Sequence, residues 1–371
     1  MRGRSERQSD LITLINVEDR IPAKHPIRRI KRMVDAVLRR LDGEFVAMYA
    51  PVGRASIPPE RLLKAKVLQA LYTVRSDRQF CERLRYDLLF QWFLDMNPSE
   101  PAFDASSFSK NMDRLLTHHL AELFFLEVVE LAKRHKWVSD QHFSVDGTLI
   151  EAWASTKSFR PKDETDDDGQ GPGGWSDFKG ESRSNATHES KTDPEAKLLK
   201  KSPGAAAKLC FGAHAVMENR NGLCVLMDVQ AAVGEGCAEH EVAARQLDEL
   251  LMRGFNVKTV GADKGYHNRR FVQACRDREI APHVARIEGR KTPGLDGRTT
   301  HAQGYRLSQR IRKRCENIFG WMKTTGALRQ SRWRGVERTH FMTNLVAATC
   351  NLARMARLME ESPPRVKTAV V

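Results

Sequence analysis

The sequence of 371 residues lacks the features that mark a secreted or a membrane protein. Its seven cysteines are an odd number without a C-x-x-C pair, so neither a disulfide framework nor zinc-ligand spacing is apparent. No apolar run approaches the roughly 18 residues that span a bilayer, and the polar first twenty residues do not resemble a signal peptide. We therefore expect a cytoplasmic protein in a reducing compartment, without a membrane partner.

Acidic residues are scarce toward the C-terminus. Residues 286–338 contain 14 Arg and Lys but only four Asp and Glu, in a chain whose net charge is +14. A solvated helix face is the simpler interpretation of a single charge run. A distribution this uneven instead favours a surface that binds a polyanion such as nucleic acid.

The periodicity of apolar residues divides the chain into two parts. Residues 1–140 show helical spacing, as in 25–41, and predict an all-helical, basic domain. Residues 141–360 predict a mixed α/β domain led by a β-hairpin, with helices alternating with the later strands. Within it, residues 155–206 predict an irregular, partly disordered insertion, and residues 361–371 predict a polar tail.

Three carboxylates stand at unusual positions. Asp146 lies inside a predicted strand, Asp263 follows another, and Glu316 lies in a predicted helix among Arg and Lys. Each alone has a simpler interpretation, namely an edge-strand or turn Asp, a strand-ending turn, and an i,i+4 ion pair with Arg312. Together they can meet at one sheet edge, where hard cations such as Mg²⁺ or Mn²⁺ would offset their repulsion. Two such ions assist in-line phosphoryl displacement.

The motifs around these residues resemble those of the DDE transposases of bacterial insertion sequences. SVDGT holds Asp146, GADKGY holds Asp263 and RKRCENIFGWMK holds Glu316, in the family's order. The resemblance covers nearly the whole chain. It implies that these three residues are the catalytic triad and bind two Mg²⁺ ions, with Mn²⁺ as a substitute.

One branch of that family carries a Tyr-Arg-Glu-Lys signature around the Glu. Arg312, Glu316 and Lys323 match its Arg, Glu and Lys at the family spacing. Gln309 stands where the branch has Tyr, and Tyr305 lies one turn earlier. The departure affects the contact that the Tyr makes rather than the metal ligands.

The resemblance further implies an RNase H-like catalytic domain, with a mixed five-stranded sheet and flanking helices, preceded by a helical DNA-binding domain. The implied reaction is metal-dependent cleavage of the terminal inverted repeats, followed by joining of the 3′-OH ends to target DNA by transesterification. The implied partners are transposon-end DNA, target DNA and a second copy of the chain, because pairing two ends favours a homodimer. The expected location is the bacterial cytoplasm, at the nucleoid.

Basic residues near the triad and in the helical domain are candidates for DNA contact. For the helical clusters, an ordinary solvated basic face stays an open interpretation, and for Lys264 a solvated Lys in a turn is an equal alternative. The candidates are Arg312, Lys323, Arg310, Lys313, Arg314, Lys264, Arg28, Arg29, Lys31 and Arg32, with a further helical cluster at Arg75, Arg78, Arg83 and Arg85.

Two alternative functions stay open. An RNase H-like metal-dependent nuclease would hydrolyse DNA without strand transfer, and a transposase-derived protein would bind DNA without chemistry. The complete triad argues against the second. The separate helical domain argues against the first, because a general nuclease has less need of a module that reads a site.

Overall fold

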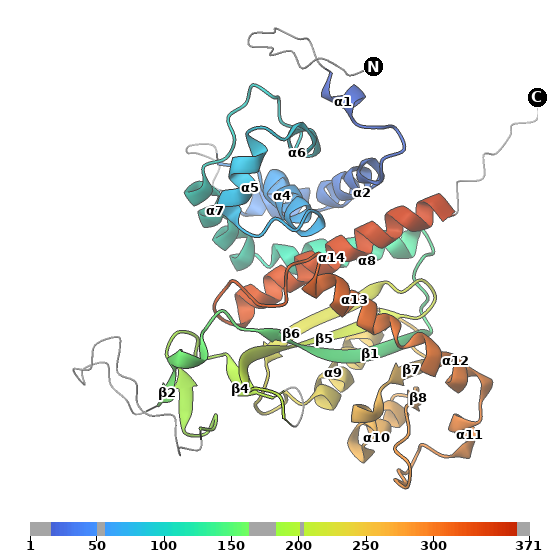
Figure 1. The fold of residues 1–371 in the computed structure, drawn as a ribbon. Helices are drawn as coiled ribbons and strands as arrows, with labels where there is room; N and C mark the ends of the chain where they lie inside the picture. Colours follow the sequence, from blue (N-terminus) through green and yellow to red (C-terminus); the bar gives the residue numbers. More distant parts are fainter. Residues whose placement is uncertain (1–15, 50–55, 163–182, 201–203, 362–371) are drawn as a thin grey trace, which may run out of the picture.

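The computed structural model describes residues 16–49, 56–162, 183–200 and 204–361 (Figure 1). Helices make up the described residues before position 140, and a mixed sheet flanked by helices makes up most of the remainder. None of the helices in these ranges is long and apolar enough to cross a membrane.

The N-terminal part is helical, as predicted. The helix expected at residues 25–41 is confirmed, and its buried residues, such as Ile30, Val34 and Val37, recur at helical spacing. The helices in its described residues are α1 (Val17–Arg20), α2 (Pro26–Arg40), α3 (Asp42–Ala47), α4 (Pro59–Leu71), α5 (Asp77–Leu84), α6 (Leu88–Phe93), α7 (Ala105–Thr117) and α8 (Leu120–Arg134).

The sheet has a hairpin on one side of its first strand and parallel strands on the other. Its core strands are β1 (His142–Glu151), β5 (Lys208–Glu218), β6 (Cys224–Ala231), β7 (Thr259–Ala262) and β8 (Ala281–Val284). They lie in the order β6-β5-β1-β7-β8. β5 is antiparallel to both β1 and β6, whereas β7 is parallel to β1 and β8 is parallel to β7. This order and these directions define an RNase H-like fold, as expected.

The sheet has one short strand beyond the expected five. A short strand, β4 (Lys197–Leu199), pairs with the first residues of β5, so the sheet within the described residues has six strands. β5 pairs with β1, β4 and β6, and every residue of β5 except the first is buried. The buried Glu218 carboxylate organises the β5–β6 turn by accepting backbone N–H bonds from Arg220, Asn221 and Leu223.

The insertion contains regular structure that the sequence did not reveal. A short helix, η1 (Thr156–Ser158), leads into β2 (Phe159–Pro161), which pairs antiparallel with β3 (His188–Ser190). Phe159 and Ala196 pack with residues of β1 and β5 in a small second core. These strands are too short to give a periodic pattern. Residues 163–182 and 201–203 of the predicted insertion lie outside the described residues.

Helices cover both faces of the sheet. Figure 1 shows α8, α13 (Arg314–Lys323) and α14 (Val336–Glu361) on one face, with α9 (Glu239–Met252) and α10 (Arg269–Asp277) on the other. α14 contacts β6 and also α2, α4 and α8, so one apolar core runs through both parts of the chain. The domain boundary near residue 140 stays a prediction.

The predicted helix around Glu316 is confirmed, but a break separates it from the helix that holds Tyr305 and Gln309. The structure has a short α11 (Gly297–Thr300), then α12 (Gln303–Ile311) and α13, with a break at Arg312 and Lys313. At the break the backbone N–H of Cys315 and of Glu316 bond three residues back, to the carbonyls of Arg312 and Lys313, at 3.0 and 3.1 Å. These tight bonds replace the usual i→i−4 pattern without a Gly or Pro to signal the change.

Candidate active site

Two of the predicted acidic residues lie side by side where two parallel strands part. The last β1–β7 pair is Ser144 with Gly261. Two residues further along each strand stand Asp146 and Asp263, at the carboxyl end of β7. Ligands of open α/β sheets sit at such carboxyl ends, so the fold brings these two carboxylates to one candidate site.

The local charges identify a strained acidic cluster. The pKa of Asp146 is raised to about 6, first by burial and then by the charges of Asp263 and Glu239, although a hydrogen bond from the backbone N–H of Gly147 lowers it. The pKa of Glu239 is also raised, by burial and then by Asp263. Burial raises the pKa of the nearby Tyr266, and the charges of Glu239, Asp146 and Asp263 raise it further. Like charges this close favour a bound cation.

Glu316 approaches the sheet from α13. It is exposed and occupies the first turn of that helix, where the helix dipole favours a carboxylate. α13 contacts both β1 and β5 and buries Cys315, the residue before Glu316. Burial raises the pKa of the Cys315 thiol, and Asp146 raises it next, which places this turn of α13 close to Asp146.

Asp146 and Asp263 are close enough to interact electrostatically, and Glu316 follows Cys315 in the turn of α13 that lies near Asp146. Within the described ranges, no group of three His, Cys, Asp or Glu side chains could hold a metal ion. The oxygen-only set formed by Asp146, Asp263 and Glu316 fits Mg²⁺ or Mn²⁺ in its chemistry.

The two cations of the Tyr-Arg-Glu-Lys signature lie against the sheet. Lys323 Nζ donates to Thr148 Oγ1 on β1 at 2.5 Å. Arg312 Nε donates to Gln309 Oε1 at 3.0 Å, and Arg312 is close enough to Asp146 to lower its pKa. Both cations therefore flank the strand that holds Asp146.

Gln309 has its own role at the position where the family branch has Tyr. Its amide nitrogen donates to the backbone carbonyl of His283 on β8, while its amide oxygen accepts from Arg312. Tyr305 donates instead to the carbonyl of Val284, at 2.9 Å. The residue that departs from the signature thus connects Arg312 to the sheet.

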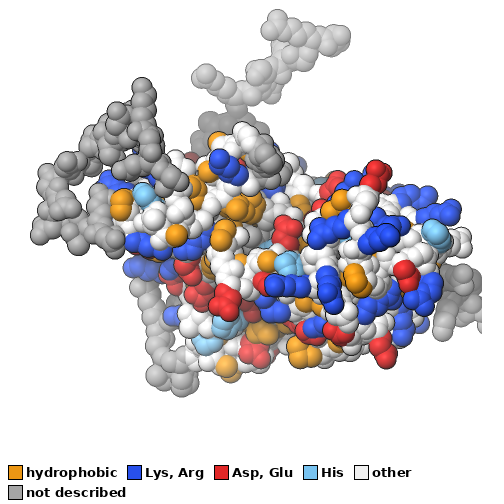
Figure 2. Space-filling view, turned by 90° about the horizontal axis from the view of Figure 1, so that it is seen from below, with side chains coloured by type: hydrophobic (Ala, Val, Ile, Leu, Met, Phe, Trp, Pro, Cys, Tyr) orange, Lys and Arg blue, Asp and Glu red, His pale blue; other side chains and the backbone are white. Residues whose placement is uncertain are grey.

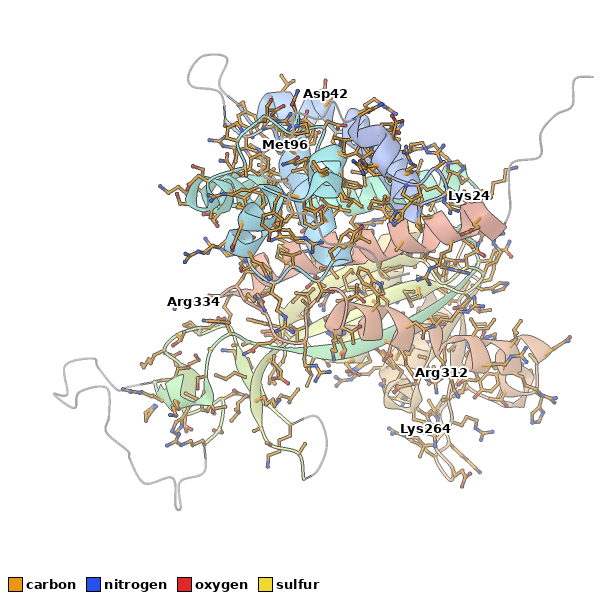
Figure 3. The ribbon with its side chains drawn as sticks, turned by 45° about the horizontal axis from the view of Figure 1, so that its top comes forward. Lys24, Asp42, Met96, Lys264, Arg312 and Arg334 are labelled. Carbon is orange, nitrogen blue, oxygen red and sulfur yellow. The ribbon has the colours of Figure 1, made fainter. Side chains whose placement is uncertain are left out.

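The remaining cations of this region differ in their environments. Lys264, Arg310 and Lys313 are exposed, whereas Arg314 donates to the backbone carbonyls of Asn219 and Arg220 at 2.7 and 2.8 Å. Figure 3 shows Lys264 and Arg312 at the same end of the α/β part. Figure 2 shows Lys and Arg side chains gathered on the face seen from below, with carboxylates among them.

The predicted cluster in α2 is largely engaged within the chain. Arg28 pairs with Glu18 and lies over the ring of Trp92. Arg29 donates to the Ala356 carbonyl of α14 at 3.1 Å, and Lys31 pairs with Asp35 and Asp95. Arg32 has an exposed side chain.

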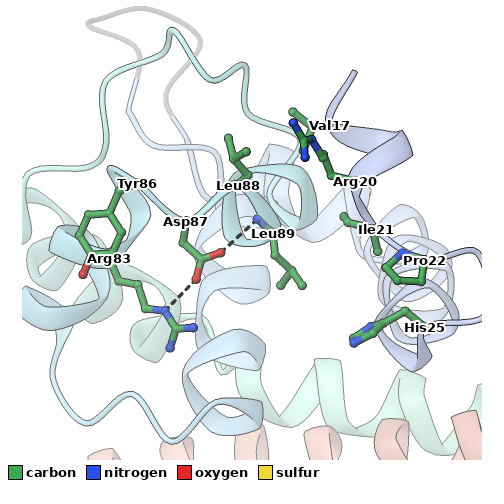
Figure 4. Close-up of a pocket in the computed structure, with 10 residues that line it drawn as sticks. All are labelled: Val17, Arg20, Ile21, Pro22, His25, Arg83, Tyr86, Asp87, Leu88 and Leu89. Carbon is green, nitrogen blue, oxygen red and sulfur yellow. Dashed lines mark hydrogen bonds and ion pairs between the residues drawn. The ribbon is translucent and has the colours of Figure 1, made fainter. Parts of the chain in front are cut away.

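The second helical cluster is more open. Arg75, Arg78 and Arg85 are exposed, while Arg83 Nε donates to Asp87 at 2.8 Å. Arg83 and Asp87 line a cavity of about 570 Å³ between α1 and the α5–α6 segment (Figure 4). This cavity belongs to the helical part and does not include any of the three predicted triad residues.

The structure defines the class of the protein first. An RNase H-like sheet with paired Asp residues at the parting of β1 and β7, beside a helix that carries Glu and several cations, is the architecture of a nucleic-acid-processing enzyme. The chain belongs to the family described as "Transposase DDE domain", whose model matches residues 138–352. A second model, "Transposase domain (DUF772)", matches residues 15–114. The protein is thus a DDE-type transposase of an insertion-sequence family, as the motifs predicted.

Solved transposase structures show only distant similarity. The piggyBac transposase synaptic complex with hairpin DNA matches at a TM-score of 0.40 and 9% identity, over 91% of this chain and 77% of that chain. The pre-cleavage Mos1 transpososome matches at 0.21 and 9%, over 83% and 82%. The fold assignment rests on the order and directions of the strands in the sheet. A search of curated proteins finds no significant match.

Proposed function

We propose that the protein cleaves the ends of its transposon by metal-dependent phosphodiester hydrolysis and joins the 3′-OH ends to target DNA. The observation that carries this proposal is the placement of Asp146 beside Asp263 at the parting of β1 and β7. Asp146, Asp263 and Glu316 would bind two Mg²⁺ or Mn²⁺ ions. These ions would supply an activated water and charge stabilisation for in-line displacement.

The basic residues around this site would hold the DNA backbone. Arg312 and Lys323 flank the Asp146 strand and would grip the end next to the cut. Exposed Lys264, Arg310 and Lys313 would extend that surface, and Arg314 would support it through the β5–β6 turn. The helical part would read the inverted repeats, with Arg32 as its most exposed candidate in α2, and two copies would pair the two ends.

A strand-transfer assay tests the proposal directly. A pre-cut transposon end, taken from the inverted repeats that flank the gene, is incubated with the protein, a target plasmid and Mg²⁺ or Mn²⁺. We expect covalently joined products that depend on the metal. Hydrolysis without any joining would instead identify a nuclease, and end binding without either reaction would identify a DNA-binding protein.

Arg312→Ala is expected to weaken end binding severalfold and to reduce the slope of log affinity against log salt by about one, because one phosphate contact is lost. Fluorescence anisotropy over a series of salt concentrations measures both quantities. Arg298→Ala is the matched control, since Arg298 is exposed in the same basic stretch and pairs locally with Asp296. An unchanged salt slope for Arg312→Ala would contradict the phosphate contact.

A further inference from the structure

Helix α9 is packed so that its first turn faces the sheet. Its buried residues include Val242, Ala243 and Leu250, and Gln246 Nε2 donates to the backbone carbonyl of His214 on β5 at 3.2 Å. Glu239 lies seven residues before Gln246, which is two helical turns and therefore the same face. Glu239 therefore lies on the same side of α9 as Gln246, which is the side that packs against the sheet.

Gly147 shows where the Glu239 carboxylate lies. A Cβ atom at Gly147 would stand 3.0 Å from Glu239 Oε1 and 3.1 Å from His214 Nδ1, closer than most real Cβ contacts. Gly147 pairs with His214 across the β1–β5 ladder and directly follows Asp146. The missing side chain therefore makes room for a carboxylate and an imidazole beside the first triad residue.

His214 is an independent sign that a ligand belongs here. Its side chain is buried, with the residue only 4% exposed, and its Nδ1 has no hydrogen-bond partner. Gly212 lies at the opposite edge of the His214 ring. A Cβ atom at Gly212 would stand 3.0 Å from His214 Nε2, so the absence of a side chain there leaves room for the ring. Buried polar atoms are nearly always paired, so an orphan nitrogen beside an acidic cluster requires an explanation.

We propose that Glu239 is a fourth carboxylate of the metal site, binding the divalent cation together with Asp146 and Asp263, and that His214 positions it. Carboxylates that bind a metal usually accept a further hydrogen bond, and His214 Nδ1 would donate that bond when Glu239 turns to the ion. The inference rests on the proposed function, because it adds a ligand to that same site.

The layers of the fold give this fourth residue a distinct place. α9 and α13 contact the same two strands, β1 and β5, and Figure 1 shows the two helices on opposite faces of the sheet. Glu239 therefore approaches the paired Asp residues from one face and Glu316 from the other. Glu239 thus adds a carboxylate to the α9 side of the Asp pair, whereas Glu316 is supplied by α13.

Titration of the full chain with Mn²⁺ in the absence of DNA tests the inference, with free Mn²⁺ followed by electron paramagnetic resonance. We expect Glu239→Gln to weaken Mn²⁺ binding at least about tenfold, and His214→Phe to weaken it less. Glu241→Gln is the matched control, because Glu241 lies in the same helical turn but pairs with Arg270 at 4.0 Å. Asp146→Asn provides the reference for loss of a triad ligand.

Thermal unfolding without metal separates a ligand from a structural role. Glu239 is held near other carboxylates, so Glu239→Gln should leave the melting temperature of the metal-free protein unchanged or raise it. Mn²⁺ affinity equal to that of Glu241→Gln, with Asp146→Asn still impaired, would overturn the fourth ligand and leave the proposed function standing. A wild-type chain that binds no Mn²⁺, or an Asp146→Asn variant that binds it normally, would overturn both.

Discussion

Glu316→Gln is expected to lower end cleavage by about a thousandfold or more while end binding stays within about twofold. The substitution keeps the shape of the side chain and removes only the negative charge, so it removes a metal ligand without disturbing α13. Glu316 is exposed, so the substitution does not alter the buried core. Single-turnover cleavage of an end oligonucleotide and a mobility-shift assay with the same oligonucleotide measure the two quantities.

Glu337→Gln is the control for Glu316→Gln. Glu337 is the next acidic residue along the basic stretch, is exposed, and lies at the start of α14. It should cleave like the unmodified protein. If Glu316→Gln lost binding in proportion to cleavage, Glu316 would have a structural role and the triad assignment would be wrong.

The largest effect on stability is expected for Asp77→Ala, which should destabilise the protein by about 3–5 kcal/mol. Lys66 is only 2% exposed, and its Nζ pairs with Asp77 Oδ1 at 2.6 Å. Gln69 and Ser109 also donate to the Asp77 carboxylate, at 3.0 and 3.2 Å. Removing the carboxylate leaves the Lys66 charge buried without its counterion. Equilibrium urea unfolding followed by circular dichroism measures the loss.

Glu130→Ala removes a carboxylate from an exposed ion pair and serves as the comparison. Glu130 Oε1 lies 2.7 Å from Lys133 Nζ on the same helix, and both side chains are accessible to solvent. Exposed pairs of this kind contribute about 0.2–1 kcal/mol. Similar losses for Asp77→Ala and Glu130→Ala would show that the Lys66–Asp77 pair does not stabilise the helical part more than a surface pair does.

The sequence predicted the elements whose pattern repeats over several turns or strand residues. α2 has a long apolar stripe, so it was located from local sequence. α3, α6 and β4 were missed because three to six residues are too few to show a period. The break before α13 was missed because backbone hydrogen bonding, rather than Gly or Pro, produces it.

Only the part of the candidate site that local sequence patterns reveal was predicted. Asp146 and Asp263 follow or interrupt apolar strands, which makes them visible in a single sequence. Glu239 gave no such signal, because an acid in the first turn of a helix is ordinary and favoured by the helix dipole. Its place beside Gly147 depends on strand pairing and helix packing between residues about ninety positions apart, which the sequence does not display. The hydrogen bond from Lys323 to Thr148 is equally non-local.

The position of α14 between the two parts of the chain has a consequence for the order of folding. α2 is made early on the ribosome, yet it packs against a helix that begins at Val336, about three hundred residues later. Contacts between such distant segments close late and slow the final folding step. The apolar faces of α2, α4 and α8 therefore stay uncovered during synthesis until α14 has been made. We expect nascent chains that stop before Val336 to expose these faces and to bind chaperones.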